Sequence, residues 1–125
     1  MLKIEINTTK VMRYNTVGDY FVNGAGTDVI EVVEMGNPID ELLIAVHELV
    51  EWVLCKNSGI TCEQIDAFDF AFKGEGEPGD EKDAPYYDAH QFATAIEMLL
   101  CGKLGLNWQK YLERTNNFST NAKEK

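Results

Sequence analysis

Apolar and polar positions alternate at the start of the chain. Residues 2–7 follow this period of two, which predicts a strand with one buried face. Two further runs rich in apolar and β-branched residues, 19–22 and 28–35, flank the Gly-rich stretch 23–27, and this arrangement predicts a β-hairpin. Residues 10–15 are either another strand or a connection. A Gly-Asn-Pro tripeptide then ends the expected sheet.

From Pro38 onward the apolar spacing changes to that of helices. The expected helices are residues 38 to about 57, 61–72 and 85–101, with a short one at 107–114. We expect residues 115–125 to form a polar, disordered tail. The pattern therefore predicts one α+β domain, in which a small antiparallel sheet (the β-rich residues 1–36) packs on three main helices within residues 38–114.

The longest expected loop, residues 73–84, is rich in glycine and acidic side chains. Such a composition is typical of a solvated connection. The loop also directly precedes the helix that carries His90, so the alternative is a mobile lid over a site on that helix.

The first helix carries the most distinctive pattern, H-E-x-x-E at His47, Glu48 and Glu51, within an apolar run. Because His47 and Glu51 stand at i and i+4, their side chains can converge on one point. Helices with H-E-x-x-H hold zinc in this way, with the intervening Glu as general base. A carboxylate oxygen is also a competent zinc ligand.

A catalytic zinc site needs a third protein ligand, and His90 is the natural candidate because the chain has only two histidines. The prediction is a zinc site at His47, Glu51 and His90, with Glu48 as the base; another divalent transition metal is the alternative. Near His90, Asp88 and Glu97 are candidates for a further ligand or for a carboxylate that orients an imidazole. Without a metal, the same groups would form a buried hydrogen-bond network.

A second pair of acids suggests a different metal chemistry. Asp66 and Asp69 follow on the next helix, so Glu48, Glu51, Asp66 and Asp69 together resemble the carboxylate clusters of all-α nucleotide pyrophosphohydrolases, which hold magnesium. The alternative is that Asp66 and Asp69 belong to a solvated helix face. The two histidines favour zinc, iron, nickel or copper over magnesium.

The overall charge narrows the classes of partner. With 21 acidic against 11 basic residues, the chain has a net charge of −10, which disfavours binding to nucleic acid. A basic partner protein would be attracted. No stretch is long and apolar enough to span a membrane, and no secretory signal is evident, so we expect a cytoplasmic protein. Three cysteines without a C-x-x-C pair are expected to be reduced thiols.

Several segments together resemble a family of small proteins encoded by tailed bacteriophages. They are residues 46–51, 56–61, 65–69, 77–80 and 84–97, within a similarity that extends roughly from residue 14 to 108. This resemblance implies a phage origin, and a location in the host cytoplasm, more firmly than it implies a function. Separately, the H-E-x-x-E helix is similar to the active helix of zincin metallopeptidases, although most zincins have His at the position of Glu51.

These observations leave three functional hypotheses. The first is a zinc-dependent hydrolase with a minimal zincin-like fold, for which peptide hydrolysis is one candidate reaction. The second is a non-enzymatic acidic protein that binds or inhibits a host factor. The third is a magnesium-dependent nucleotide hydrolase that uses Glu48, Glu51, Asp66 and Asp69.

Overall fold

The computed structural model of the chain describes the backbone of residues 1–124 and the side chains of residues 1–118. In this part of the chain, three strands precede four α-helices and one short 3-10 helix. The elements are β1 (Ile4–Thr9), β2 (Gly18–Val22), β3 (Asp28–Val33), α1 (Pro38–Ser58), α2 (Cys62–Ala71), η1 (Pro78–Asp80), α3 (Tyr87–Lys103) and α4 (Trp108–Glu124). The expected α+β class is confirmed.

The sheet has the strand order β1-β3-β2. β2 and β3 pair antiparallel, as the hairpin prediction required. β1 pairs with β3 in parallel, so the sheet is mixed, and the expectation of a purely antiparallel sheet was wrong. The reason lies in β3, where Val29, Ile30, Val32 and Val33 are all buried, which suits the central position of a sheet. Residues 10–17 connect β1 to β2 and let β1 pair on the far side of β3.

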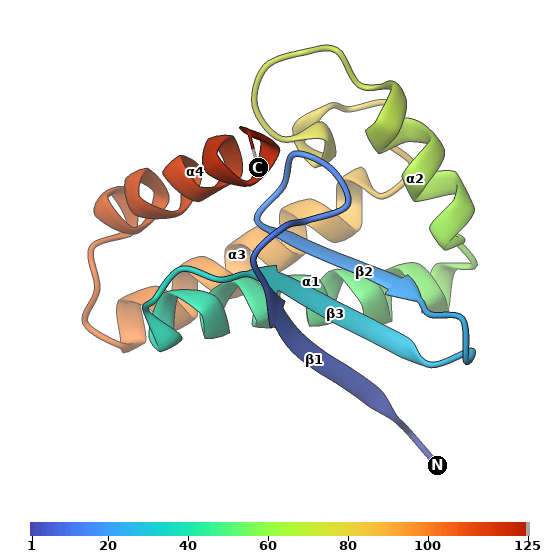
Figure 1. The fold of residues 1–125 in the computed structure, drawn as a ribbon, viewed down its shortest axis with the longest axis horizontal. Helices are drawn as coiled ribbons and strands as arrows, with labels where there is room; N and C mark the ends of the chain where they lie inside the picture. The colour runs from blue at the N-terminus through green and yellow to red at the C-terminus, as the bar shows by residue number, and fades with distance from the viewer. Residues whose placement is uncertain (125) are drawn as a thin grey trace.

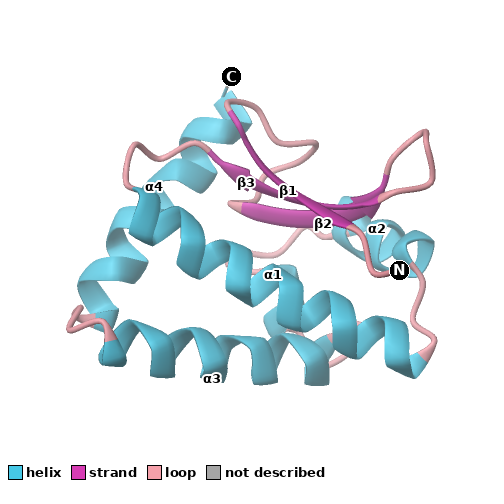
Figure 2. Ribbon diagram, turned by 90° about the horizontal axis from the view of Figure 1, so that it is seen from below, coloured by secondary structure: helices cyan, strands magenta, loops and turns pink. Residues whose placement is uncertain are grey.

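The helices cover one face of the sheet, with α1 packed directly against it and α3 packed against α1. Figure 2 shows α1 between the sheet and α3, with α2 near one end of the sheet and α4 near the other. The N-terminus extends away from the helices along β1 (Figure 1). The side chains that are buried most completely come from every layer of this arrangement: Ile30, Val32, Leu43, Cys55, Cys101 and Tyr111.

Capping interactions define both ends of α1. The side chain of Asn37 accepts hydrogen bonds from the backbone of Ile39 and Asp40 at the N-terminus. At the C-terminus, Gly59 adopts φ +76°, and its N–H reaches carbonyl groups of the last turn. α1 therefore matches the expected span, and α2 begins with a capping box formed by Thr61 and Gln64.

The last helix is longer than the sequence pattern predicted. α4 continues to Glu124, whereas we expected a helix that ends near Arg114 and a disordered tail. Long-range contacts explain part of the difference, because Tyr111 is completely buried, Thr115 is buried one turn later and Arg114 pairs with Asp40 at 2.9 Å. Residue 125, the end of the expected tail, lies outside the described residues. Among the described helices, none has the length and hydrophobicity needed to cross a membrane.

Candidate metal centre

Two helices bring the three predicted ligands together. α1 presents His47 and Glu51 one turn apart, and α3, packed along α1, presents His90. His47 Nε2 lies 3.1 Å from Glu51 Oε2 and 3.2 Å from His90 Nδ1. His90 Nδ1 lies 2.9 Å from the same Glu51 oxygen. All three side chains are buried, and they form a candidate metal-binding group among the described residues.

Carboxylates face the outer nitrogen of each imidazole. His47 Nδ1 lies 2.7 Å from Glu97 Oε1, and the other Glu97 oxygen accepts a hydrogen bond of 2.5 Å from Tyr111. His90 Nε2 lies 3.3 Å from Asp80 Oδ1. If each ring donates its outer N–H to these carboxylates, both inner nitrogens present lone pairs to the Glu51 oxygen. Three lone pairs so close together require a proton or a metal cation among them.

The spacing of the three inner atoms fits zinc. Zinc ligands at bond lengths of about 2.0–2.1 Å stand about 3.3 Å apart at the corners of a tetrahedron. The three distances between the inner atoms of His47, Glu51 and His90 are 2.9, 3.1 and 3.2 Å. They are slightly shorter than the ligand–ligand distance in such a tetrahedron. Two imidazoles and one carboxylate are also the ligand set of a known class of hydrolytic zinc sites. The residues present therefore fit zinc in both chemistry and spacing.

In the absence of a metal, protons take its place. Burial lowers the pKa of His47, but hydrogen bonds with Glu51 and Glu97 raise it overall to about 11. Burial likewise opposes the charge of His90, and its contact with Glu51 raises the pKa of His90. Burial would raise the pKa of Glu51, yet its hydrogen bonds with both imidazoles lower that pKa. In the metal-free protein, the raised pKa values of His47 and His90 thus favour protonated imidazoles at the point where a cation would bind.

Glu48 lies beside this group on the next position of α1. Its Oε2 is 3.9 Å from His47 Nε2, too far for a hydrogen bond. β2 approaches Glu48 closely at Gly18, where an added Cβ would stand 2.8 Å from Glu48 Cγ. Burial, followed by the negative charge of Glu51, raises the pKa of Glu48 well above that of an ordinary carboxyl. The arrangement leaves an acidic side chain next to the candidate metal-binding group, of which it is not a member.

A cleft of ≈ 260 Å³ opens onto this site. One part of its lining is acidic and contains Glu48, Glu77, Asp80 and Glu97 together with both histidines. Another part is apolar, and its side chains come from the start of β2, from α1, from α3 and from α4: Val17, Ile44, Met98, Trp108 and Leu112. A small molecule in the cleft would therefore lie against Glu48, His47 and His90.

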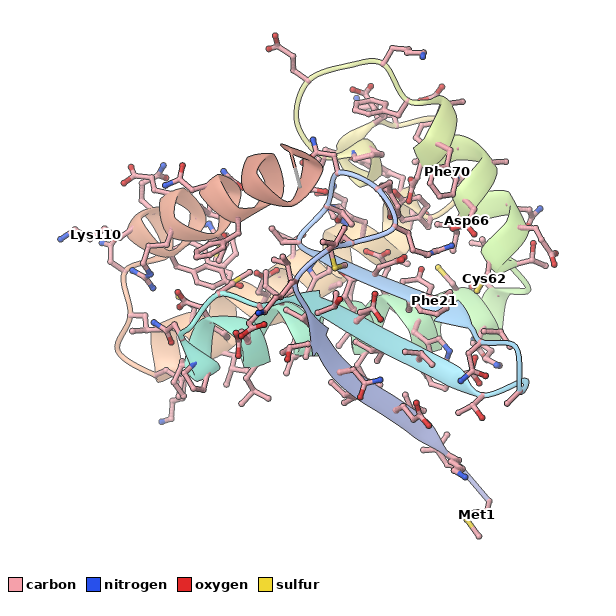
Figure 3. All side chains as sticks on the ribbon, viewed as in Figure 1. Met1, Phe21, Cys62, Asp66, Phe70 and Lys110 are labelled. Carbon is pink, nitrogen blue, oxygen red and sulfur yellow. The ribbon has the colours of Figure 1, made fainter. Side chains whose placement is uncertain are left out.

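The other acids singled out in the sequence have different positions. Asp66, labelled on α2 in Figure 3, pairs with Arg13 through contacts of 3.1 Å and does not join the cluster. Asp69 is buried and accepts hydrogen bonds from Tyr14 at 2.8 Å and Tyr86 at 2.5 Å. Asp88 is exposed, which argues against its role as a ligand. The proposed magnesium cluster is therefore incomplete.

Glu97 has the orienting role that the sequence suggested, but toward His47 rather than toward His90. Three contributors to the site were missed: Glu77, Asp80 and Tyr111. Glu77 and Asp80 lie in the loop of residues 73–84. The only sequence signal for their involvement was that this loop directly precedes the helix that carries His90. That loop packs on the site through η1, because a Cβ added at Gly79 would lie 2.5 Å from His90 Cγ.

Comparisons of the chain with protein-family models, with curated proteins and with solved structures give no match. The similarities to tailed-bacteriophage proteins and to zincins therefore remain predictions from the sequence. The site has to be interpreted from its own geometry.

Proposed function

We propose that the protein is a zinc-dependent hydrolase, in which His47, Glu51 and His90 hold the metal and Glu48 is the general base. The observation that carries the proposal is the convergence of three buried ligand atoms within 3.2 Å of one another at the end of an open cleft. A purely structural metal site is normally closed by four protein ligands, whereas a catalytic one keeps a position for water or substrate.

Each residue has a defined task in this proposal. A bound zinc ion would lower the pKa of a coordinated water toward neutrality. Glu48 would take up a proton from the attacking water and return it to the leaving group. Glu97 accepts the outer N–H of His47, which leaves the inner nitrogen of that ring available as a ligand. Asp80 lies 3.3 Å from the outer nitrogen of His90 and favours a proton there by its charge.

The decisive comparison is between the wild type and Glu48→Gln, both loaded with zinc. Their hydrolysis of p-nitrophenyl acetate and of leucine 7-amido-4-methylcoumarin would be measured at a known zinc content. We expect Glu48→Gln to keep one zinc per chain and to lose about 10²–10⁴-fold in turnover. Glu63→Gln, an exposed carboxylate on α2, serves as the matched control and should retain full activity.

Two results would count against the proposal. The first is a zinc-loaded wild type that hydrolyses neither substrate but captures a host protein in stoichiometric amount. If Glu48→Gln captures the same protein equally well, the non-enzymatic binding protein is supported instead. The second is equal turnover by wild type and Glu48→Gln, which would show that Glu48 is not the general base.

A further inference from the structure

The charge of the cleft is strongly one-sided. Its described lining residues include four carboxylates and neither lysine nor arginine. Glu51 adds a fifth carboxylate from the metal group. Burial raises the pKa of Glu48 and of Glu77. Even if both were neutral and the imidazoles neutral too, Glu51, Asp80 and Glu97 would exceed the charge of one divalent cation by one. Even with zinc bound, the site would therefore repel anions such as phosphate esters and attract cations.

The carboxylates of the cleft differ in their side-chain partners. Glu97 is engaged by His47 and Tyr111, while Asp80 is shared between His90 and Gln91. Among the described residues, no side-chain hydrogen bond to Glu77 is found, although its side chain is partly buried and lines the cleft. Glu77 is thus available to a cationic ligand group, and Asp80, exposed nearby in the same loop, adds to the attraction.

The rest of the cleft limits the size and polarity of a ligand. Trp108 and Leu112 of α4 and Met98 of α3 provide an apolar surface within the same cavity. The volume of ≈ 260 Å³ lies near the lower end of small-molecule sites, which typically have about 300–1,000 Å³. A long peptide would not fit inside, whereas a single amino-acid residue with a small leaving group would.

We propose that the cleft selects small amides or esters of apolar amino acids with a free, protonated α-amino group. The ammonium group faces Glu77 and Asp80, and the apolar side chain packs against Trp108. This inference rests on the proposed function, because the scissile carbonyl is placed at the metal group. It disfavours nucleotides and other phosphate esters as substrates.

The test measures binding and does not depend on turnover. Zinc-loaded protein of known metal content is titrated calorimetrically with leucine hydroxamate and with N-acetyl-leucine hydroxamate, which differ in the positive charge. The free amine should bind at least about tenfold more tightly, the range expected of one hydrogen bond to a charged group. Glu77→Gln should reduce this preference, whereas Glu81→Gln, an exposed acid of the same loop, should leave it unchanged.

The apolar contact has its own comparison. Trp108→Ala should weaken the binding of leucine hydroxamate while it leaves glycine hydroxamate unaffected. Equal or tighter binding of the acetylated compound, or no binding of either compound to zinc-loaded protein, overturns this inference alone. A wild type that binds no zinc overturns the proposed function and this inference with it.

Discussion

At the scale of single residues, the candidate site includes carboxylates outside the group of three proposed ligands. Glu97 holds His47 from the side opposite to the metal group, and Tyr111 holds Glu97 in turn. Tyr111 is completely buried, so this chain of contacts is anchored in the hydrophobic core. Such partners fix the tautomer of a ligating histidine and raise its basicity.

Replacing Glu97 should therefore weaken the metal site without removing it. We expect Glu97→Gln to bind one zinc ion with about 10–100-fold lower affinity, because a neutral amide supports the imidazole less well. Competition with a chromophoric zinc chelator measures this affinity. Glu113→Gln, an exposed acid on the same protein, is the control, and an affinity of Glu97→Gln equal to that control would refute the orienting role.

Asp69 predicts a pH dependence of stability that is separate from the metal. Burial raises the pKa of Asp69 to about 6, against the opposing effect of hydrogen bonds from Tyr86 and Tyr14. The unfolded chain releases this proton near pH 3.8, and the folded protein releases it near pH 6. The contribution of Asp69 to stability is thus complete below pH 3.8 and is lost as the pH rises to about 6.

Asp69→Asn should lack this loss. Urea unfolding of wild type and variant at pH 4 and pH 7 gives the comparison, with the free energy of unfolding of the variant falling less over that interval. An identical pH dependence of the two proteins would show that Asp69 titrates normally in the folded state.

At the scale of the elements, α3 shows what a sequence pattern can and cannot predict. The span of α3 is close to the predicted residues 85–101, but the face that it buries is not the most apolar one. The helical spacing of Phe92, Ile96, Leu99 and Leu100 alone would place these apolar side chains in the core, yet Phe92 and Leu99 are 54% and 70% exposed. The helix instead buries His90, Ala93, Glu97 and Cys101. Hydrophobic periodicity assigns apolar side chains to the core, and it fails where a polar site occupies the buried face.

The candidate ligands could be found because their spacing is local or their number is small. His47 and Glu51 share a helix, and His90 was the one remaining histidine. Glu77 and Asp80 could not be assigned, because their positions depend on the path of a loop that no periodicity describes. The parallel pairing of β1 was missed for a related reason, since it depends on a long-range contact.

The loop between α2 and α3 is a structural part of the site, and η1 supplies the contact. Pro78 and Gly79 are buried, and a Cβ at Gly79 would stand 2.7 Å from His90 Nδ1, a proposed ligand atom. Gly79→Ala should displace His90 or η1 and lower zinc affinity about tenfold, as overpacking typically costs about 1–3 kcal/mol.

The control for this prediction is Gly24→Ala in the β-hairpin loop, where an added Cβ meets nothing within 4 Å. Zinc titrations of both variants against the wild type give the result. Wild-type affinity in Gly79→Ala would mean that η1 does not constrain His90.

At the scale of the whole molecule, the proposed metal would join α1 and α3. α1 and α3 share the most extensive helix–helix contact, and the ligands come from both. A cation between them would also offset part of the net charge of −10, which otherwise opposes compact folding. Metal binding and folding should therefore be coupled.

Zinc should consequently stabilise the fold. At a free zinc concentration of about 100 times the dissociation constant, we expect the free energy of unfolding to rise by about 2.7 kcal/mol. A chelator should reverse the effect, and His90→Ala should show no zinc-dependent change. Chemical denaturation of both proteins with and without zinc measures it, and a wild-type stability independent of zinc would contradict the coupling.

The central claim, a metal at the meeting point of His47, Glu51 and His90, is tested most directly by anomalous X-ray diffraction. Crystals of protein purified without a histidine tag and supplied with one equivalent of zinc would be measured on both sides of the zinc absorption edge. We predict a single strong anomalous peak about 2.0–2.2 Å from His47 Nε2, His90 Nδ1 and a Glu51 oxygen. Crystals with fully ordered side chains and no anomalous peak among these three atoms would contradict the account.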